Sequence, residues 1–137
     1  MAEYDLNSSV KAAMAITPVA ATAIADGSVI DTLGFESVEF IVFSGTLGTG
    51  TVDFQLEESD VITFGGEEND VDADDLIGTT PTVLATEDDK VWRFGYKGTK
   101  RFLRLQNIET ASWTSMIHGA VCILGNPVVK PVASQVT

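Results

Sequence analysis

Few residues in this chain have the types and the spacing that chemistry needs. The clearest candidates are the aspartates Asp70, Asp72 and Asp74, because carboxylates at alternate positions can converge on a hard cation such as Ca²⁺. The remainder of a calcium loop is missing, since its sixth position is Asp75 instead of glycine and its twelfth is Pro81 instead of glutamate. We therefore expect a solvated acidic loop, in which the three aspartates are weak metal candidates.

The usual groups of covalent and acid–base catalysis are sparse. His118 is the only histidine and Cys122 the only cysteine, so an internal disulfide and a site with several thiolates are both excluded. The sequence contains no GxSxG, HExxH or CxxC motif and no phosphate-binding glycine loop before a helix. We expect both residues to be structural, and we expect no cofactor and no enzymatic activity.

Three aromatic residues alternate along one predicted strand. Trp92, Phe94 and Tyr96 would share one face, with Arg93 on the other. Exposed, they would form a stacking platform for a sugar or a base, whereas aromatics at strand spacing that face an aliphatic row are typical of a core. The core interpretation is favoured.

Composition excludes some classes of partner. The net charge is −12, with 8 basic and 20 acidic residues, which argues against a general nucleic-acid-binding protein because phosphate contacts need a positive face. No apolar run approaches the length of a membrane span, and the first residues are acidic where a signal peptide is basic. We expect a protein that is made in the cytoplasm and does not enter a membrane.

The charges are segregated along the chain. Six basic residues lie in the window from Lys90 to Arg104, and nine acidic residues lie between Glu57 and Asp75. Two interpretations remain open: two solvated faces that differ in sign, or a head-to-tail contact between copies in which the acidic loop meets a basic hairpin.

Alternating apolar and polar residues predict strands along most of the chain. Residues 36–44 and 52–57 are expected to form a hairpin around a glycine-rich loop, and residues 91–97 and 100–108 a second one around Gly98 and Thr99. Residues 36–44 are apolar on both faces after Glu39, which indicates a central strand that is covered on both sides. Residues 12–25, interrupted by Pro18, read as an edge strand.

Roughly seven to nine short strands with frequent turn signals predict an all-β protein, a β-sandwich of jelly-roll or Greek-key type. We expect the sandwich over residues 13–126, between an extended N-terminal arm at residues 1–12 and an extended C-terminal arm at residues 127–137. Apolar residues in both arms suggest that the arms lie against something else.

Several segments together resemble a known family. They are "ID-x-x-GFESVEF-x-V" (Ile30 to Val42), a glycine- and threonine-rich loop (Gly45 to Thr51), "F-x-x-x-ESD" (Phe54 to Asp60), "ADDLIGT" (Ala73 to Thr79), "GYKGTKRFLRL" (Gly95 to Leu105) and a strand ending in "GNP" (Ala120 to Pro127). This pattern resembles the small decoration, or cement, proteins that are encoded in the head-gene region of tailed bacteriophages and prophages.

The resemblance implies a structural virion protein on the outer surface of the capsid, which binds the major capsid protein, stabilises the shell and associates with itself, commonly as a homotrimer. The motifs are structural in type and imply no catalytic residue. The interface candidates come from the two arms and the basic segment: Tyr4, Leu6, Lys97, Lys100, Arg101, Arg104, Val128, Val129 and Val132.

Two alternatives remain. A carbohydrate-binding sandwich would leave Trp92, Tyr96 and Trp113 partly exposed and would use the acidic loop for calcium. A neck or tail structural component would differ from a decoration protein in copy number, with few copies per particle instead of hundreds.

Overall fold

The structure is a computed structural model that describes residues 5–64, 69–109 and 113–132. The described part contains strands and two short 3-10 turns, η1 (Asn7–Ser9) and η2 (Ala73–Asp75). The strands are β1 (Val10–Ala21), β2 (Ala25–Asp31), β3 (Phe35–Thr49), β4 (Thr51–Ser59), β5 (Asn69–Asp70), β6 (Leu76–Ile77), β7 (Thr82–Leu84), β8 (Val91–Tyr96), β9 (Phe102–Glu109) and β10 (Thr114–Pro127).

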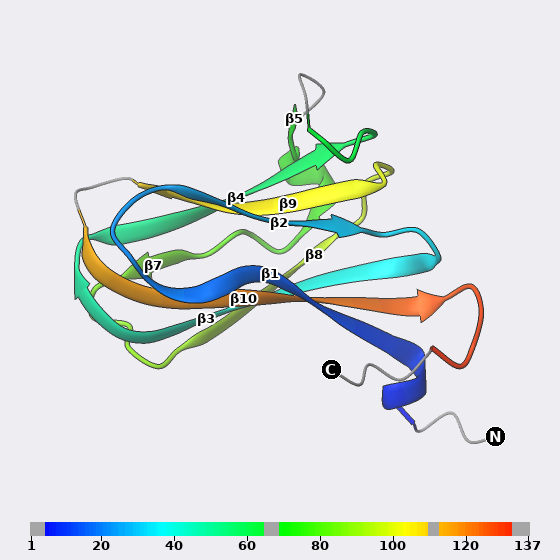
Figure 1. The fold of residues 1–137 in the computed structure, drawn as a ribbon, viewed down its shortest axis with the longest axis horizontal. Helices are drawn as coiled ribbons and strands as arrows, with labels where there is room; N and C mark the ends of the chain where they lie inside the picture. The colour runs from blue at the N-terminus through cyan, green and yellow to red at the C-terminus, as the bar shows by residue number, and fades with distance from the viewer. Residues whose placement is uncertain (1–4, 65–68, 110–112, 133–137) are drawn as a thin grey trace.

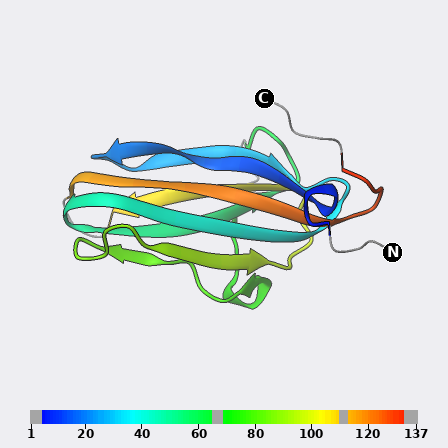
Figure 2. The same ribbon diagram turned by 90° about the horizontal axis from the view of Figure 1, so that it is seen from below.

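The strands form two antiparallel sheets that pack face to face, so the chain is a β-sandwich (Figure 1). One sheet, which we call sheet A, has the order β1-β10-β3-β8-β6, and the other, sheet B, has the order β2-β9-β4-β5, with β7 also paired to β4. Figure 2 shows β1, β10, β3 and β8 side by side. This order, in which the chain alternates between the sheets, is that of a jelly roll and confirms the predicted fold class.

The core lies between the sheets and is formed by one side of each strand. Phe40 and Val42 of β3 are fully buried, as are Leu103 and Leu105 of β9. The ring of Phe40 stacks on that of Phe94, with ring centroids 5.3 Å apart. The period-two pattern of the sequence therefore identified the inward side of β8, which carries Phe94, correctly.

The predicted hairpin between residues 36–44 and 52–57 is wrong. β3 pairs with β10 and β8, whereas β4 pairs with β9, β5 and β7, so the two strands lie in different sheets. The glycines have another role, because a Cβ on Gly48 would lie 1.8 Å from the carbonyl oxygen of Thr114 in β10. Gly48 thus permits close pairing inside a long β3, and the chain crosses to the other sheet at Gly50, where φ is 112°.

The second predicted hairpin is wrong for a similar reason. β8 belongs to sheet A and β9 to sheet B, so residues 97–101 connect the sheets. A Cβ on Gly98 would lie 2.4 Å from the hydroxyl oxygen of Tyr96. That hydroxyl accepts a hydrogen bond from the backbone N–H of Lys100 at 3.0 Å and donates one to Glu58 of β4 at 2.5 Å. Gly98 is therefore needed for packing beneath a buried tyrosine.

Two predictions about individual strands are confirmed. β1, which contains Pro18, is an edge strand of sheet A, and β3 is its central strand. The pairing of β1 with β10 shifts between Ile16 and Val19, around the proline. β1 begins at Val10, within the predicted N-terminal arm, and β10 extends to Pro127.

Candidate interaction surface

Exposed aliphatic side chains gather where several strands begin or end. Leu6 precedes η1, Leu33 lies in the turn between β2 and β3, and Val128 and Val129 follow β10. Their exposed fractions are 71%, 67%, 70% and 76%. Figure 1 shows these segments at the same end of the sandwich. We call these four residues the terminal patch.

Hydrogen bonds hold the segments of the terminal patch against the sandwich. The backbone N–H of Val128 donates to the carbonyl oxygen of Gly34 at 2.9 Å, and that of Val132 donates to the carbonyl oxygen of Ser8 at 2.9 Å. The Asn126 amide donates to the carboxylate of Glu36 at 2.7 Å. Val132, one of the predicted interface residues, is half-buried by this arrangement.

Two of the predicted basic interface residues already have partners in the same chain. Arg101 binds Asp31 through two hydrogen bonds, of 2.9 and 2.8 Å, and Lys100 forms an ion pair with Asp60. The hydrogen bonds from Arg101 lower the pKa of Asp31 to about 2. The acidic and basic segments therefore meet partly within one chain.

Arg104 is also part of the fold. Its guanidinium lies 2.6 Å from the carboxylate of Glu57 and 3.4 Å from that of Asp26, and it stacks 4.5 Å from the ring centre of Phe64. Glu57 is buried and accepts a second hydrogen bond, of 2.7 Å, from Gln106. The contacts of Arg104 thus connect β9 with β4 and β2.

Lys97 is the most available of the predicted basic residues. Its side chain is exposed, and within the described ranges no ion pair is found for it. It lines an open groove of about 860 Å³ between the β2–β3 turn and the β8–β9 connection, together with Leu33, Tyr96 and Ile123. Tyr4, the remaining candidate, lies outside the described residues.

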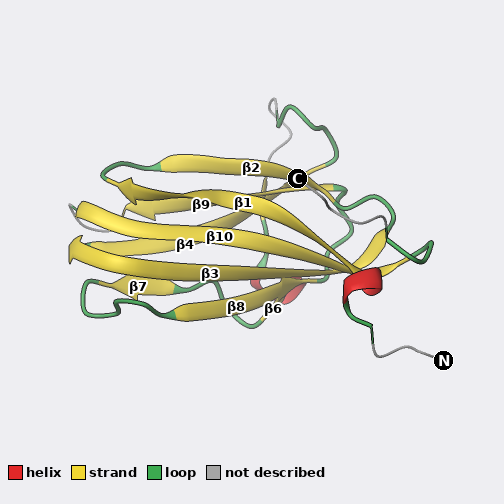
Figure 3. Ribbon diagram, turned by 60° about the horizontal axis from the view of Figure 1, so that its bottom comes forward, coloured by secondary structure: helices red, strands yellow, loops and turns green. Residues whose placement is uncertain are grey.

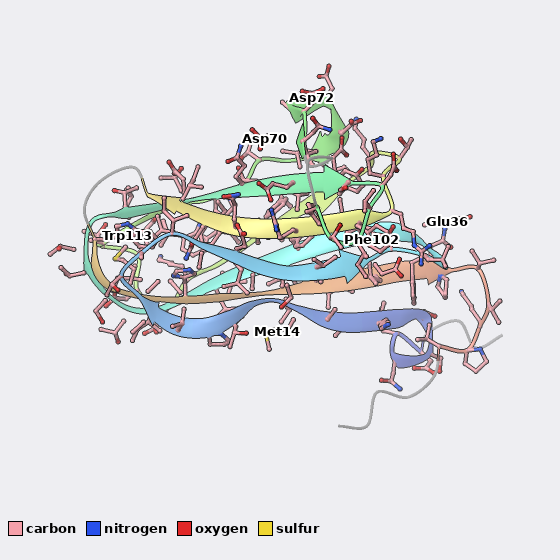
Figure 4. The ribbon with its side chains drawn as sticks, turned by 45° about the horizontal axis from the view of Figure 1, so that its top comes forward. Met14, Glu36, Asp70, Asp72, Phe102 and Trp113 are labelled. Carbon is pink, nitrogen blue, oxygen red and sulfur yellow. The ribbon has the colours of Figure 1, made fainter. Side chains whose placement is uncertain are left out.

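The predicted metal candidates do not form a site. Asp70 is in β5, Asp72 precedes η2 and Asp74 is in η2, and all three are exposed. Asp70 and Asp72 project from one edge of the molecule (Figure 4). Within residues 5–64, 69–109 and 113–132, no three His, Cys, Asp or Glu side chains are placed to hold a metal ion.

The other residues that the sequence singled out are in the core. His118 and Cys122 are 1% and 0% exposed, and burial raises the pKa of the Cys122 thiol to about 12, so the thiol is unreactive at neutral pH. Tyr96 and Trp113 are buried and Trp92 is half-buried, which confirms that these aromatics belong to the core. They do not form a stacking platform.

Leu33 of the terminal patch was not among the interface residues predicted from the sequence. β2 ends at Asp31, and Leu33 lies in the turn that follows. The available signal was an aliphatic residue directly before Gly34, whose positive φ of 91° marks the turn.

Comparisons with known proteins give little further information. No protein-family model matches the sequence, and a search of curated proteins found no match. Among solved structures, the chain is similar to one described as "Crystal structure of PirA", with a TM-score of 0.44 and 9% identity over 92% of this chain and 100% of that chain. A likeness this weak does not indicate what the chain does.

None of the helical segments that the structure describes is long and apolar enough to cross a membrane.

Proposed function

We propose that this chain is a structural protein of a tailed-phage virion, which decorates the outside of the capsid by binding the major capsid protein. The proposal assigns it no catalytic role and no cofactor. The observation that supports the proposal is the terminal patch. Two segments of the family resemblance adjoin it in the sequence, because "GFESVEF" directly follows Leu33 and "GNP" directly precedes Val128. Four aliphatic side chains, each about two-thirds or more exposed, lie at one end of the sandwich on segments that are joined by backbone hydrogen bonds. Such a preformed apolar patch is typical of a docking surface.

The terminal patch and Lys97 suit a partner with apolar and acidic groups. Burial of each patch side chain stabilises a complex by about 1–2 kcal/mol. Lys97 would add electrostatic attraction at the rim, since its charge is not compensated by an ion pair in the described part of the chain.

Binding to heads tests the proposal. Heads from the phage that encodes the chain, produced without it, are mixed with the purified protein and sedimented. We expect the wild-type protein to bind in hundreds of copies per head and the Leu33→Ser/Val128→Ser/Val129→Ser variant to bind at least about tenfold more weakly. The matched control is Ile24→Ser/Leu84→Ser, which changes two residues that are 55% and 47% exposed and lie away from the terminal patch.

Two results would contradict the proposal. Heads that do not bind the wild-type protein would exclude decoration, and equal binding by the patch variant would exclude the terminal patch as the contact. A few bound copies per particle would indicate the alternative function in a neck or tail.

A further inference from the structure

The outward side of sheet A is unusually apolar. In the strand register, Met14 of β1 lies beside Val121 of β10, which lies beside Ile41 of β3. Ile117 and Ile123 flank this row on β10, and Phe43 flanks it on β3. Met14 and Ile117 are 47% and 38% exposed, and the other four are half-buried by their neighbours within the sheet.

Nothing in the described part of the chain covers this surface. Figure 3 shows sheet A in front of sheet B, and no described segment crosses the middle of its outward side. The sequence predicts that the strand at 36–44 is covered on both sides. In the structure, sheet B covers the inward side of this strand, β3, and its outward side has no cover in the described part of the chain. We call this surface the sheet A face.

The outward side of sheet B provides the internal comparison. Asp53 and Gln55 of β4 point outward there, and Gln55 is paired with Gln106 of β9. This is the polar pattern expected of a sheet side that faces water. The two outward sides of the sandwich therefore differ in polarity.

The charges on the sheet A face restrict its partner. Near its centre are one acidic residue, Glu39, and one basic residue, Arg93, whose charged groups are 3.7 Å apart. The Arg93 side chain is 82% exposed, so it is free to turn toward a second molecule. A surface with an acid and a base side by side is complementary to itself, because Arg93 of each copy can meet Glu39 of the other.

We propose that the sheet A face is a contact between copies of this chain. A copy of the chain offers the matching apolar surface and the reciprocal charge pair. The contact includes one acidic residue, Glu39, and its charge is matched by that of Arg93, although the net charge of each copy is −12. This inference does not depend on capsid binding.

The sheet A face has the area of a small contact. Three strands of more than nine residues, β1, β10 and β3, and the shorter β8, spaced by about 4.8 Å and taken over about nine residues of about 3.3 Å each, give a surface of about 19 by 30 Å, or roughly 550 Å² per copy. Stable interfaces bury about 800 Å² per partner. Flat apolar sheets are well suited to packing on one another, as they do inside a sandwich.

The mass of the full chain in solution tests the proposal. Light scattering after size-exclusion chromatography should give a mass of two or more chains of 14.6 kDa each. Val121→Lys should raise the dissociation constant at least about tenfold, since it would bury a charge in the contact. Gln55→Lys, on the outward side of sheet B, is the matched control and should leave the mass unchanged.

A mixing experiment separates the contact from effects on folding. The Glu39→Arg variant carries two basic residues at the charge pair and the Arg93→Glu variant two acidic ones, so each alone should associate more weakly than the wild-type protein. Mixed together they should form a heteromeric species, because opposite charges then face one another across the contact.

Three results would overturn the proposal. One is a wild-type chain that stays monomeric at about 100 µM, a concentration that would reveal even weak association. Another is a folded Val121→Lys variant with unchanged mass. The third is a monomeric chain in which Val121→Lys abolishes binding to heads, which would assign the sheet A face to the capsid.

Discussion

At the scale of single residues, the buried histidine has a structural role. His118 Nδ1–H donates to the carbonyl oxygen of Met116 at 2.8 Å, and His118 Nε2 accepts from the side-chain amide of Asn107 at 2.9 Å. Asn107 in turn accepts the backbone N–H of Ala25 at 2.6 Å. These bonds link β10 of sheet A to β9 of sheet B, and they use both ring nitrogens of a neutral imidazole. No ring nitrogen is left for catalysis or metal binding.

This network predicts a pH dependence of stability. Burial lowers the pKa of His118, so the folded chain keeps it neutral at pH values where the unfolded chain protonates it. The free energy of unfolding should therefore be highest above about pH 6.5. Below that value it should fall by up to about 1.4 kcal/mol per pH unit, until the pH reaches the folded-state pKa.

Urea unfolding at intervals between about pH 5.5 and 7.5 measures this slope, since His is the side chain that ordinarily titrates there. The His118→Phe variant is the comparison, because it lacks the titrating group whatever its absolute stability. Equal slopes in the two proteins would contradict the assignment.

At the scale of elements, a largely buried ion pair links β4 and β9. Glu57 and Arg104 are paired residues of these strands, and their side chains are only 11% and 18% exposed. An ion pair so far removed from water differs from the open pair of Arg93 and Glu39. The sequence predicts Arg104 at an interface, and its contacts in the structure give it a role within sheet B as well.

We expect Arg104→Met to lower the free energy of unfolding by about 2–3 kcal/mol, because it leaves the Glu57 carboxylate buried without its cation. Arg93→Met should change it by less than about 0.5 kcal/mol. Both values come from urea denaturation of variants under conditions where the protein is monomeric. Similar losses for the two variants would show that burial of Glu57 is not decisive.

The junction of β1, β2 and β9 requires a glycine. A Cβ on Gly27 would lie 2.3 Å from the carbonyl oxygens of both Ala15 and Leu105, and neither backbone can move without disturbing its strand. Gly27→Ala should therefore lower the free energy of unfolding by about 2–4 kcal/mol.

Gly125→Ala is the control, since its Cβ would make an ordinary contact at 3.7 Å. It should change the free energy of unfolding by less than about 1 kcal/mol. Thermal or urea unfolding followed by circular dichroism compares the two variants. A tolerated Gly27→Ala would mean that β2 can shift relative to its neighbours.

At the scale of the whole molecule, the charge is distributed unevenly between surfaces. Sheet B has a polar outward side, the sheet A face is nearly uncharged, and the terminal patch is apolar with Lys97 nearby. The molecule as a whole carries a net charge of −12. Copies therefore repel one another except where the apolar surfaces meet.

Salt should then strengthen association. Arg101 and Arg104 are paired within the chain, so an acidic-to-basic contact between copies is a poor driving force. Raising NaCl from about 50 to 500 mM screens the repulsion between like-charged copies and leaves apolar contacts intact. Sedimentation equilibrium should show a lower dissociation constant at high salt. Dissociation at high salt would contradict this prediction and would instead support a head-to-tail contact between the acidic and basic segments of different copies.

Much of the fold could be predicted from the sequence, because side-chain alternation depends only on the chain itself. The inward sides of β8 and β9, the edge position of β1 and the sandwich class follow from apolar spacing, Pro18 and the frequency of turns. The burial of His118 and Cys122 follows in the same way, from their alternation with outward residues of β10.

Strand partners could not be predicted, because period-two alternation specifies a side and not a neighbour. In a jelly roll consecutive strands enter opposite sheets, so β3 and β8 do not pair with the strands that follow them. The glycines at 48 and 98 read as turns, yet they serve close packing with segments distant in sequence or with a buried tyrosine.

The candidate surfaces show the same division. The sequence by itself determined that both chain ends carry apolar residues and that the chain has no recognisable catalytic motif. Only the tertiary structure decided that Leu6, Leu33 and Val128 meet at one end, that Arg101 and Arg104 are already paired, and that one outward side is apolar. The physical reason is that each of these properties depends on strand register and sheet order, which bring together residues that are far apart in the chain.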